Sequence, residues 1–121
     1  MADRVLTWFI KGVLSQTGVV GSNVSNTYVL DKDYVPEIVH LILKGAPADG
    51  AGCKIDINDD STSIFPDTPR QPVIGQGITV SEWSTFLSTM LRKGSKITLD
   101  IDSVSTTTPG SDLSIELWLK E

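Results

Sequence analysis

The sequence predicts an all-β protein, an antiparallel β-sandwich of the jelly-roll type, from three observations. Residues 95–102 and 112–120 alternate between apolar and polar side chains, as strands with one buried face do. Other short apolar segments recur about every 8–12 residues between Gly- and Pro-rich turns, which is typical of sandwiches and jelly rolls. The chain of 121 residues is long enough for one domain, so we expect a single sandwich over residues 1–121.

The composition is that of an ordinary soluble protein and argues against several classes of function. Apolar residues make up 40% of the chain, charged residues 21%, and the formal net charge is -5. The Lys and Arg residues are scattered, so we expect no nucleic-acid partner. No apolar run approaches the ~20 residues of a membrane span, and no signal-peptide pattern begins the chain, so we expect no membrane partner and synthesis in a cytoplasm. Cys53 is the only cysteine, which excludes an internal disulfide.

The first strand is predicted at residues 4–14 and is apolar on both faces. A strand of this kind is normally covered on both sides, so another copy of the chain or another protein is expected to cover its second face. The alternative is that Val5 and Phe9 lie near the edge of the sandwich. The two faces carry Leu6, Trp8, Ile10 and Leu14 on one side and Val5, Phe9 and Val13 on the other.

The next part of the chain is predicted to consist of loops and short strands. Its Gly-, Ser- and Asn-rich stretches predict loops, and its alternating stretches predict strands. The hairpin turn within it lacks the usual Gly. In order, we expect a loop at 15–26, a strand at 27–30, a turn at 31–33, a strand at 35–44, a Gly-rich connection at 45–52, a strand at 53–57, the hairpin turn at 58–61 and its returning strand at 62–65.

The last part contains the only helical spacing. Residues 66–77 hold three prolines and two glycines and predict an irregular loop, followed by a brief strand at 78–80. The positions i, i+3, i+4, i+7 and i+8 from Trp83 are all apolar, which predicts a short helix over residues 81–93. The two alternating strands then follow, joined by a Pro-Gly turn at 107–111, and we expect them to pair with each other.

A calcium-like spacing of acidic residues lies around the hairpin turn. Ser61 stands where a calcium loop needs Gly, and the flanking segments are strands rather than helices. A solvated hairpin tip is therefore the favoured interpretation, and no metal is expected. Positions 1, 3, 5 and 12 of the calcium pattern are matched by Asp56, Asn58, Asp60 and Asp67.

No catalytic residue is predicted, and no cofactor. Asp56, Asp100 and Asp102 lie on outward faces and could converge, as a glycosidase requires of its carboxylates. A solvated charged face is favoured, because no apolar surroundings are evident that would hold one of them protonated. His40 is the only histidine and has no Gly-x-Ser-x-Gly partner motif, so we expect a packed histidine. Cys53 alternates with apolar residues and is expected in the core.

The aromatic residues carry more information about binding. Trp118 falls on the polar face of its strand, which suggests an interface anchor or a sugar-stacking platform; the favoured interpretation is that another part of the chain covers it. Tyr28 is a second candidate platform. Trp83 is expected in the core of the helical turn, and Trp8 either in the core or at an interface. The candidate interface residues are Val5, Trp8, Phe9 and Trp118.

Five stretches together resemble a small β-sandwich module that recurs in virion proteins of tailed bacteriophages. In that module an Ala-Pro turn, an Asp-Gly hairpin and a Pro-Gly-Ser-Asp turn connect the strands; here Asp60-Ser61 replaces Asp-Gly. The motifs specify strands and turns and contain no catalytic residues. The stretches are TWFIKGVL at 7–14, GAPADG at 45–50, IDINDDSTSIF at 55–65, GSKITLDID at 94–102 and TPGSDL at 108–113.

The resemblance implies a non-enzymatic component of a phage virion, made in the host cytoplasm. Such a protein is either a capsid decoration protein or a tail or fibre component. Its expected partners are other virion proteins, such as major capsid or tail proteins, together with further copies of itself, for example in a trimer. The alternative function is a carbohydrate-binding module that recognises a host-surface glycan through Trp118 or Tyr28.

Overall fold

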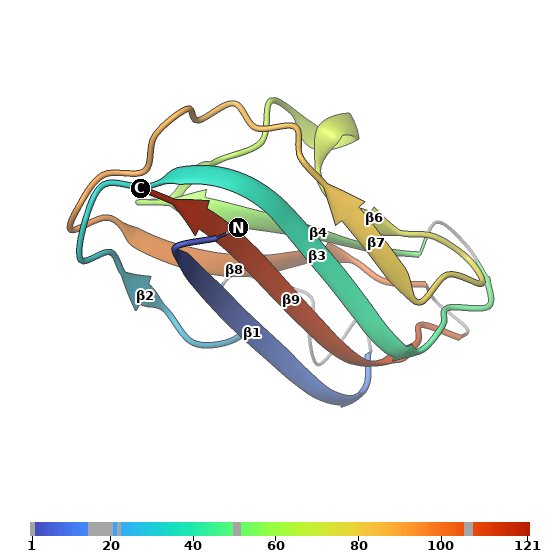
Figure 1. Cartoon of the computed structure of the whole chain (residues 1–121). Helices are drawn as coiled ribbons and strands as arrows, with labels where there is room; N and C mark the ends of the chain where they lie inside the picture. The colour runs from blue at the N-terminus through green and yellow to red at the C-terminus, as the bar shows by residue number, and fades with distance from the viewer. Residues whose placement is uncertain (1, 15–20, 22, 50–51, 106–107) are drawn as a thin grey trace.

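The protein is a sandwich of two antiparallel sheets, which confirms the fold class that the sequence predicts (Figure 1). The computed structural model describes residues 2–14, 21, 23–49, 52–105 and 108–121. The elements within these residues are β1 (Arg4–Val13), β2 (Tyr28–Val29), β3 (Val35–Gly45), β4 (Cys53–Asp59), β5 (Thr62–Ser63), the 3-10 helix η1 (Thr68–Arg70), β6 (Val73–Ile74), β7 (Val80–Trp83), β8 (Lys96–Ser103) and β9 (Ser111–Lys120).

The front sheet has the strand order β1-β9-β3-β7, and the back sheet has the order β2-β8-β4-β5, with β6 also paired to β4. Figure 1 looks onto the front sheet, with β8 and β4 behind it and both chain termini at one end. Backbone hydrogen bonds hold the termini together: the N–H of Asp3 donates to the carbonyl of Leu119 at 2.9 Å. The long strands β9 and β3 form the middle of the front sheet, because each is paired with a strand on both sides.

The core lies between the sheets and is built by the period-two alternation of both. β9 alternates buried and half-buried residues from Asp112 to Leu119, and β8 does so over most of its length. Burial of each large apolar side chain contributes about 1.5–3 kcal/mol, which is the main driving force for such a sandwich. The largest fully buried side chains are Trp8, Phe65, Leu6, Leu14, Leu30, Leu41, Leu43, Ile55, Ile57, Ile64, Ile74 and Leu91.

The expected pairing of the last two strands is wrong. β8 pairs with β2 and β4 in the back sheet, whereas β9 pairs with β1 and β3 in the front sheet. Two strands with one apolar face each can bury those faces side by side in one sheet or opposite each other across a core. The alternation alone does not distinguish these arrangements, and here the chain crosses from one sheet to the other.

The predicted helix over residues 81–93 is also wrong. Residues 80–83 form the edge strand β7, paired with β3, and residues 84–90 are irregular. Of the apolar residues in the helical pattern, Leu87 and Met90 are exposed, whereas only Leu91 is fully buried. Ser and Thr fill the positions between them, and these short polar side chains favour non-helical backbone. Leu91 is instead fixed by a backbone bridge to Tyr34.

The predicted hairpin between β4 and β5 is confirmed and has an unusual turn. Asp59 pairs with Thr62, so the loop consists of Asp60 and Ser61 alone. Both have positive φ angles, of 47° and 73°, as the preferred two-residue hairpin turn requires. The backbone N–H of Lys96 donates to the Asp60 carboxylate at 3.0 Å and anchors this turn to β8.

The free edge of β1 is blocked at its middle by a tyrosine. The Thr7 N–H donates to the hydroxyl of Tyr28 at 3.2 Å, and that hydroxyl donates to the Thr7 carbonyl at 2.7 Å. The Tyr28 ring packs edge-on against the buried ring of Trp8, with centroids 5.4 Å apart. The Trp8 indole N–H donates to the carbonyl of Asn26 at 2.7 Å. β2 and the segment before it therefore cover one edge of the sandwich, next to β1.

Parts of three predicted connections lie outside the described residues. These are residues 15–20 and 22 of the loop at 15–26, residues 50–51 of the connection at 45–52, and residue 107 of the turn at 107–111. The predicted strands at 4–14, 27–30, 35–44, 53–57, 62–65, 95–102 and 112–120 correspond to β1, β2, β3, β4, β5, β8 and β9. The predicted strand at 78–80 is misplaced, because it shares only Val80 with β7. The predicted irregular loop at 66–77 contains η1 and the short strand β6.

Candidate protein-interaction surface

The outward side chains of the front sheet form rows that cross the strands. Directly paired residues of antiparallel strands point to the same face, so the strand register defines the first three of these rows. We call this surface the front face. Its rows are an end row of Val5, Trp118 and Ile38, an acidic row of Thr7, Glu116, His40 and Glu82, an apolar row of Phe9, Ser114, Ile42 and Val80, and a basic row of Lys11, Asp112 and Lys44. The fourth row lies where the register of β1 and β9 shifts, and its members are grouped because they line one surface depression.

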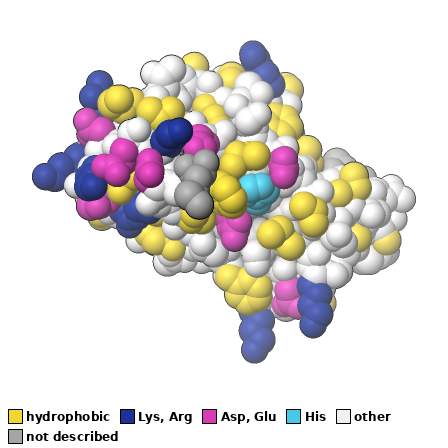
Figure 2. Space-filling view, in the orientation of Figure 1, with side chains coloured by type: hydrophobic (Ala, Val, Ile, Leu, Met, Phe, Trp, Pro, Cys, Tyr) yellow, Lys and Arg dark blue, Asp and Glu magenta, His cyan; other side chains and the backbone are white. Residues whose placement is uncertain are grey.

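The three apolar residues of the apolar row are all exposed. The exposed fractions are 51% for Phe9, 38% for Ile42 and 57% for Val80. The apolar and basic rows together line a shallow depression of about 430 Å³. Figure 2 looks onto this face and shows hydrophobic side chains beside the histidine. A run of exposed apolar side chains across one sheet is a feature of surfaces that contact other molecules.

The acidic row surrounds the single histidine. The Nε2 atom of His40 lies 3.3 Å from Glu82 Oε1, and its Nδ1 atom lies 3.8 Å from Glu116 Oε1. The Trp118 indole N–H donates to the same Glu116 oxygen at 3.2 Å. Figure 2 shows acidic side chains on either side of the histidine. Within the part of the chain that is described, neither glutamate forms an ion pair with Lys or Arg.

Three of the four predicted interface residues lie on the front face, and one does not. Val5 and Phe9 are exposed there, at 42% and 51%. Trp118 is half-buried, and its ring packs edge-on against His40 with centroids 4.9 Å apart. Trp8 is completely buried, so its side chain belongs to the core and offers no surface to a partner.

Sequence reasoning missed two members of the apolar row, Ile42 and Val80. Ile42 stands between Leu41 and Leu43, so the strand is apolar on both faces at this point, which is the signal that identified β1. Val80 lies in the edge strand β7 and pairs with Ile42, a register that no sequence pattern indicates.

The back sheet carries the acidic residues that the sequence singles out, and one of them is not solvated. Asp56 is only 8% exposed, which corrects the expectation of a fully solvated carboxylate face. Burial raises the pKa of Asp56, and the charges of Asp102 and Asp100 raise it further, while a hydrogen bond from the Ser63 hydroxyl at 2.6 Å opposes the shift. Burial and Asp100 also raise the pKa of Asp102.

We expect Asp56→Asn to stabilise the protein at neutral pH by about 0.5–1 kcal/mol, since water still screens part of the charge. The amide keeps an acceptor for Ser63 and removes the repulsion from Asp100 and Asp102. Because the folded state raises the pKa of Asp56, the wild type should be most stable below about pH 4 with respect to this group and lose that stability as the pH rises towards neutrality.

Urea unfolding of both proteins at about pH 5 and about pH 7 measures this effect. The gain from Asp56→Asn should be larger at the higher pH, and Asp59→Asn on the same strand serves as the control. A variant that is less stable than the wild type at neutral pH would show that the Asp56 carboxylate is a net stabilising group.

The residues of the calcium-like spacing do not converge. Across the described ranges, no group of three or more His, Cys, Asp or Glu side chains is arranged to hold a metal ion. Each of the four side chains bonds to a different protein group: Asp56 accepts from Ser63, Asn58 donates to Asp100, Asp60 accepts from the Lys96 N–H, and Asp67 accepts from Arg70.

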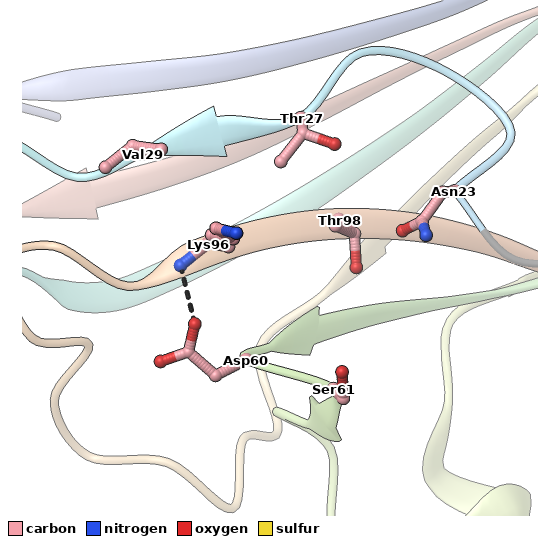
Figure 3. Close-up of a pocket in the computed structure, with 7 residues that line it drawn as sticks. All are labelled: Asn23, Thr27, Val29, Asp60, Ser61, Lys96 and Thr98. Atoms are coloured by element: carbon pink, nitrogen blue, oxygen red, sulfur yellow. Dashed lines mark hydrogen bonds between the residues drawn. The ribbon is translucent and has the colours of Figure 1, made fainter.

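A second surface feature is a polar cleft of about 570 Å³ on the back sheet (Figure 3). Figure 3 shows side chains from the hairpin turn, β8 and the segment before and within β2 around this cleft. Asn23, Asp60 and Ser61 line it with backbone φ angles of 56°, 47° and 73°, a conformation that costs free energy in non-glycine residues. The lining consists of Asn23, Thr27, Val29, Asp60, Ser61, Lys96 and Thr98.

The two aromatic platforms expected for a sugar do not lie in this cleft. Tyr28 packs against Trp8 and its hydroxyl bonds to the β1 backbone, while Trp118 is on the other sheet. The cleft instead offers amide, hydroxyl, carboxylate and ammonium groups.

Comparisons of the chain with known protein families, with curated proteins and with solved structures find no match. Among the described residues, no helix has the length and apolar character that crossing a membrane requires.

Proposed function

We propose that this protein is a non-enzymatic structural component of a tailed-phage virion, a capsid decoration protein or a tail or fibre component. It acts through protein–protein contacts made by the front face. The observation that carries this proposal is the exposed apolar row at Phe9, Ile42 and Val80, which crosses the front sheet from β1 to β7. The sequence resemblance to virion modules supports the setting.

The rigidity of the front sheet also supports a role in assembly. β9 and β3 are paired over nearly their full lengths, and β1 is paired with β9 over most of its own. The paired backbone of such a sheet loses little further conformational freedom on binding, which favours repeated contacts on a particle surface. The partners are other virion proteins, and the site of action is the virion after synthesis in the host cytoplasm.

Quantitative mass spectrometry of purified particles that carry this gene tests the proposal. We expect the protein in the particles, with hundreds of copies for a head protein and a few to a few dozen for a tail component. Phe9→Ser should reduce its incorporation, whereas Val29→Ser, which changes an exposed apolar residue on the back sheet, should not. Particles that lack the wild-type protein would refute the proposal.

The polar cleft favours a second candidate function, binding of a host-surface glycan. A mixture of hydrogen-bond donors and acceptors in a cleft of this size suits a polyhydroxylated ligand. Screening the protein on a glycan array tests this function. Binding that is lost in Thr98→Ala would support the cleft as the sugar site, binding lost in Trp118→Ala would place it on the front sheet, and no binding would refute it.

A further inference from the structure

We propose that the front face binds the front face of a second copy of this chain, in a two-fold symmetric dimer whose axis runs along the apolar row. This inference rests on the proposed function in one respect, the choice of the front face as the contact surface. A two-fold arrangement also favours a dimer over the trimer expected from the sequence.

The order of the rows is the first argument. Along the strands, the acidic row with Glu116 and Glu82 is followed by the apolar row and then by the basic row with Lys11 and Lys44. A two-fold axis along the apolar row places the apolar row of one copy on the apolar row of the other. It also places the acidic row of each copy over the basic row of the other, with each strand over the same strand. Glu82 and Glu116 then lie diagonally across from the lysines of the second copy, and each attraction occurs twice. Glu116 directly faces Asp112, whose carboxylate already accepts a hydrogen bond from the Gly12 N–H.

The second argument is that these charges lack partners within one chain. Neither Lys11 nor Lys44 forms an ion pair in the part of the chain that is described, and the two glutamates contact only the His40 ring and the Trp118 N–H. Sheets that pack face to face lie about 10 Å apart, a distance that extended Lys and Glu side chains can span together. A second copy therefore supplies the partner that each charge lacks.

The charges also select the direction of the axis. An axis parallel to the strands would place the acidic row of one copy on the acidic row of the other, and like charges repel there. The axis along the apolar row avoids this repulsion. It also brings the end row, with Val5 and the half-buried Trp118, towards the opposite end of the second copy, where Val13 is 73% exposed.

The size of the front face sets the expected strength. Four strands and four rows cover about 20 by 23 Å, from the usual strand spacing and rise. Two such surfaces with their side-chain relief bury about 1,000 Å², which is at the lower limit of specific interfaces. We therefore expect a dimer in the micromolar range, the strength suited to a contact that is repeated on a particle.

Exchange of the charges tests the arrangement directly. We expect sedimentation velocity of the full chain at up to millimolar concentration to show a monomer–dimer equilibrium. Lys44→Glu and Glu82→Lys alone should each weaken self-association about tenfold, because each reversal creates repulsion at both symmetric positions. An equimolar mixture of the two variants should associate about as strongly as the wild type, because the changed rows then attract each other.

Controls separate this result from loss of folding and from the proposed function. Both changed residues are exposed, so circular dichroism should show unchanged folding. Phe9→Ser should abolish the dimer, whereas Val29→Ser on the back sheet should leave it unchanged. A wild-type monomer at millimolar concentration, or a mixture that stays as weak as its components, would overturn the dimer. Neither result bears on whether particles contain the protein, which is measured on virions.

Discussion

Trp8→Ala is expected to lower the free energy of unfolding by about 3–5 kcal/mol, the usual cost of emptying a large buried aromatic site. Trp8 is completely buried between the sheets, and its indole N–H is satisfied by the carbonyl of Asn26. The variant loses this packing, leaves the carbonyl unpaired and removes the edge-on contact with Tyr28. For a domain of this size the loss is a large share of the total stability.

Urea unfolding followed by circular dichroism measures this loss. Trp118→Ala is the matched control, because it removes the same side chain from a half-buried position in the front sheet, and it should cost about 1–2 kcal/mol. A similar loss of unfolding free energy for the two variants would mean that the fully buried Trp8 stabilises the protein no more than the half-buried Trp118 does. Trp8 would then again be a candidate interface residue.

Gly52→Ala is expected to destabilise the protein by about 3 kcal/mol or more, through the sum of backbone strain and overpacking. Gly52 has a φ of 84°, and a Cβ atom at this position would lie 1.8 Å from the backbone carbonyl oxygen of Ile74. Because the obstacle is backbone, the strand β6 must move away from β4 to make room, and the pairing of Cys53 with Ile74 is disturbed.

Gly94→Ala separates the two contributions to this effect. Gly94 has nearly the same φ, 86°, but a Cβ atom there would meet nothing within 4 Å. It should therefore cost only the backbone strain, about 1–2 kcal/mol. Thermal unfolding of both variants gives the comparison, and equal losses would show that the close approach to Ile74 contributes nothing.

The sequence allowed most of the strands to be predicted, except β6 and most of β7, but not their partners. Alternation identified β4, β8 and β9 because it reports only which side of a strand is buried. It could not assign β8 and β9 to different sheets, since that depends on contacts between distant segments. The error at residues 81–93 has a related cause: Trp83 and Leu91 follow a helical spacing, yet β7 gains more by pairing with the exposed edge of β3.

The candidate site could be predicted only in part, for the same reason. The doubly apolar β1 indicated Phe9 as a surface residue, and the exposed position of Phe9 agrees with that expectation. The apolar row exists because four strands align Phe9, Ile42 and Val80 across the sheet, and this register is a property of the tertiary structure. The burial of Asp56 could likewise not be predicted, because the apolar and polar residues around it alternate as they do in a strand with one solvated face.

The hydroxyl of Tyr28 has a consequence for behaviour at high concentration. A long peripheral strand with free N–H and C=O groups invites other chains to add to it, and this can lead to fibrils. Tyr28 occupies both groups of Thr7 at the centre of that strand, so an incoming chain meets an aromatic ring where it would need a hydrogen-bonding partner.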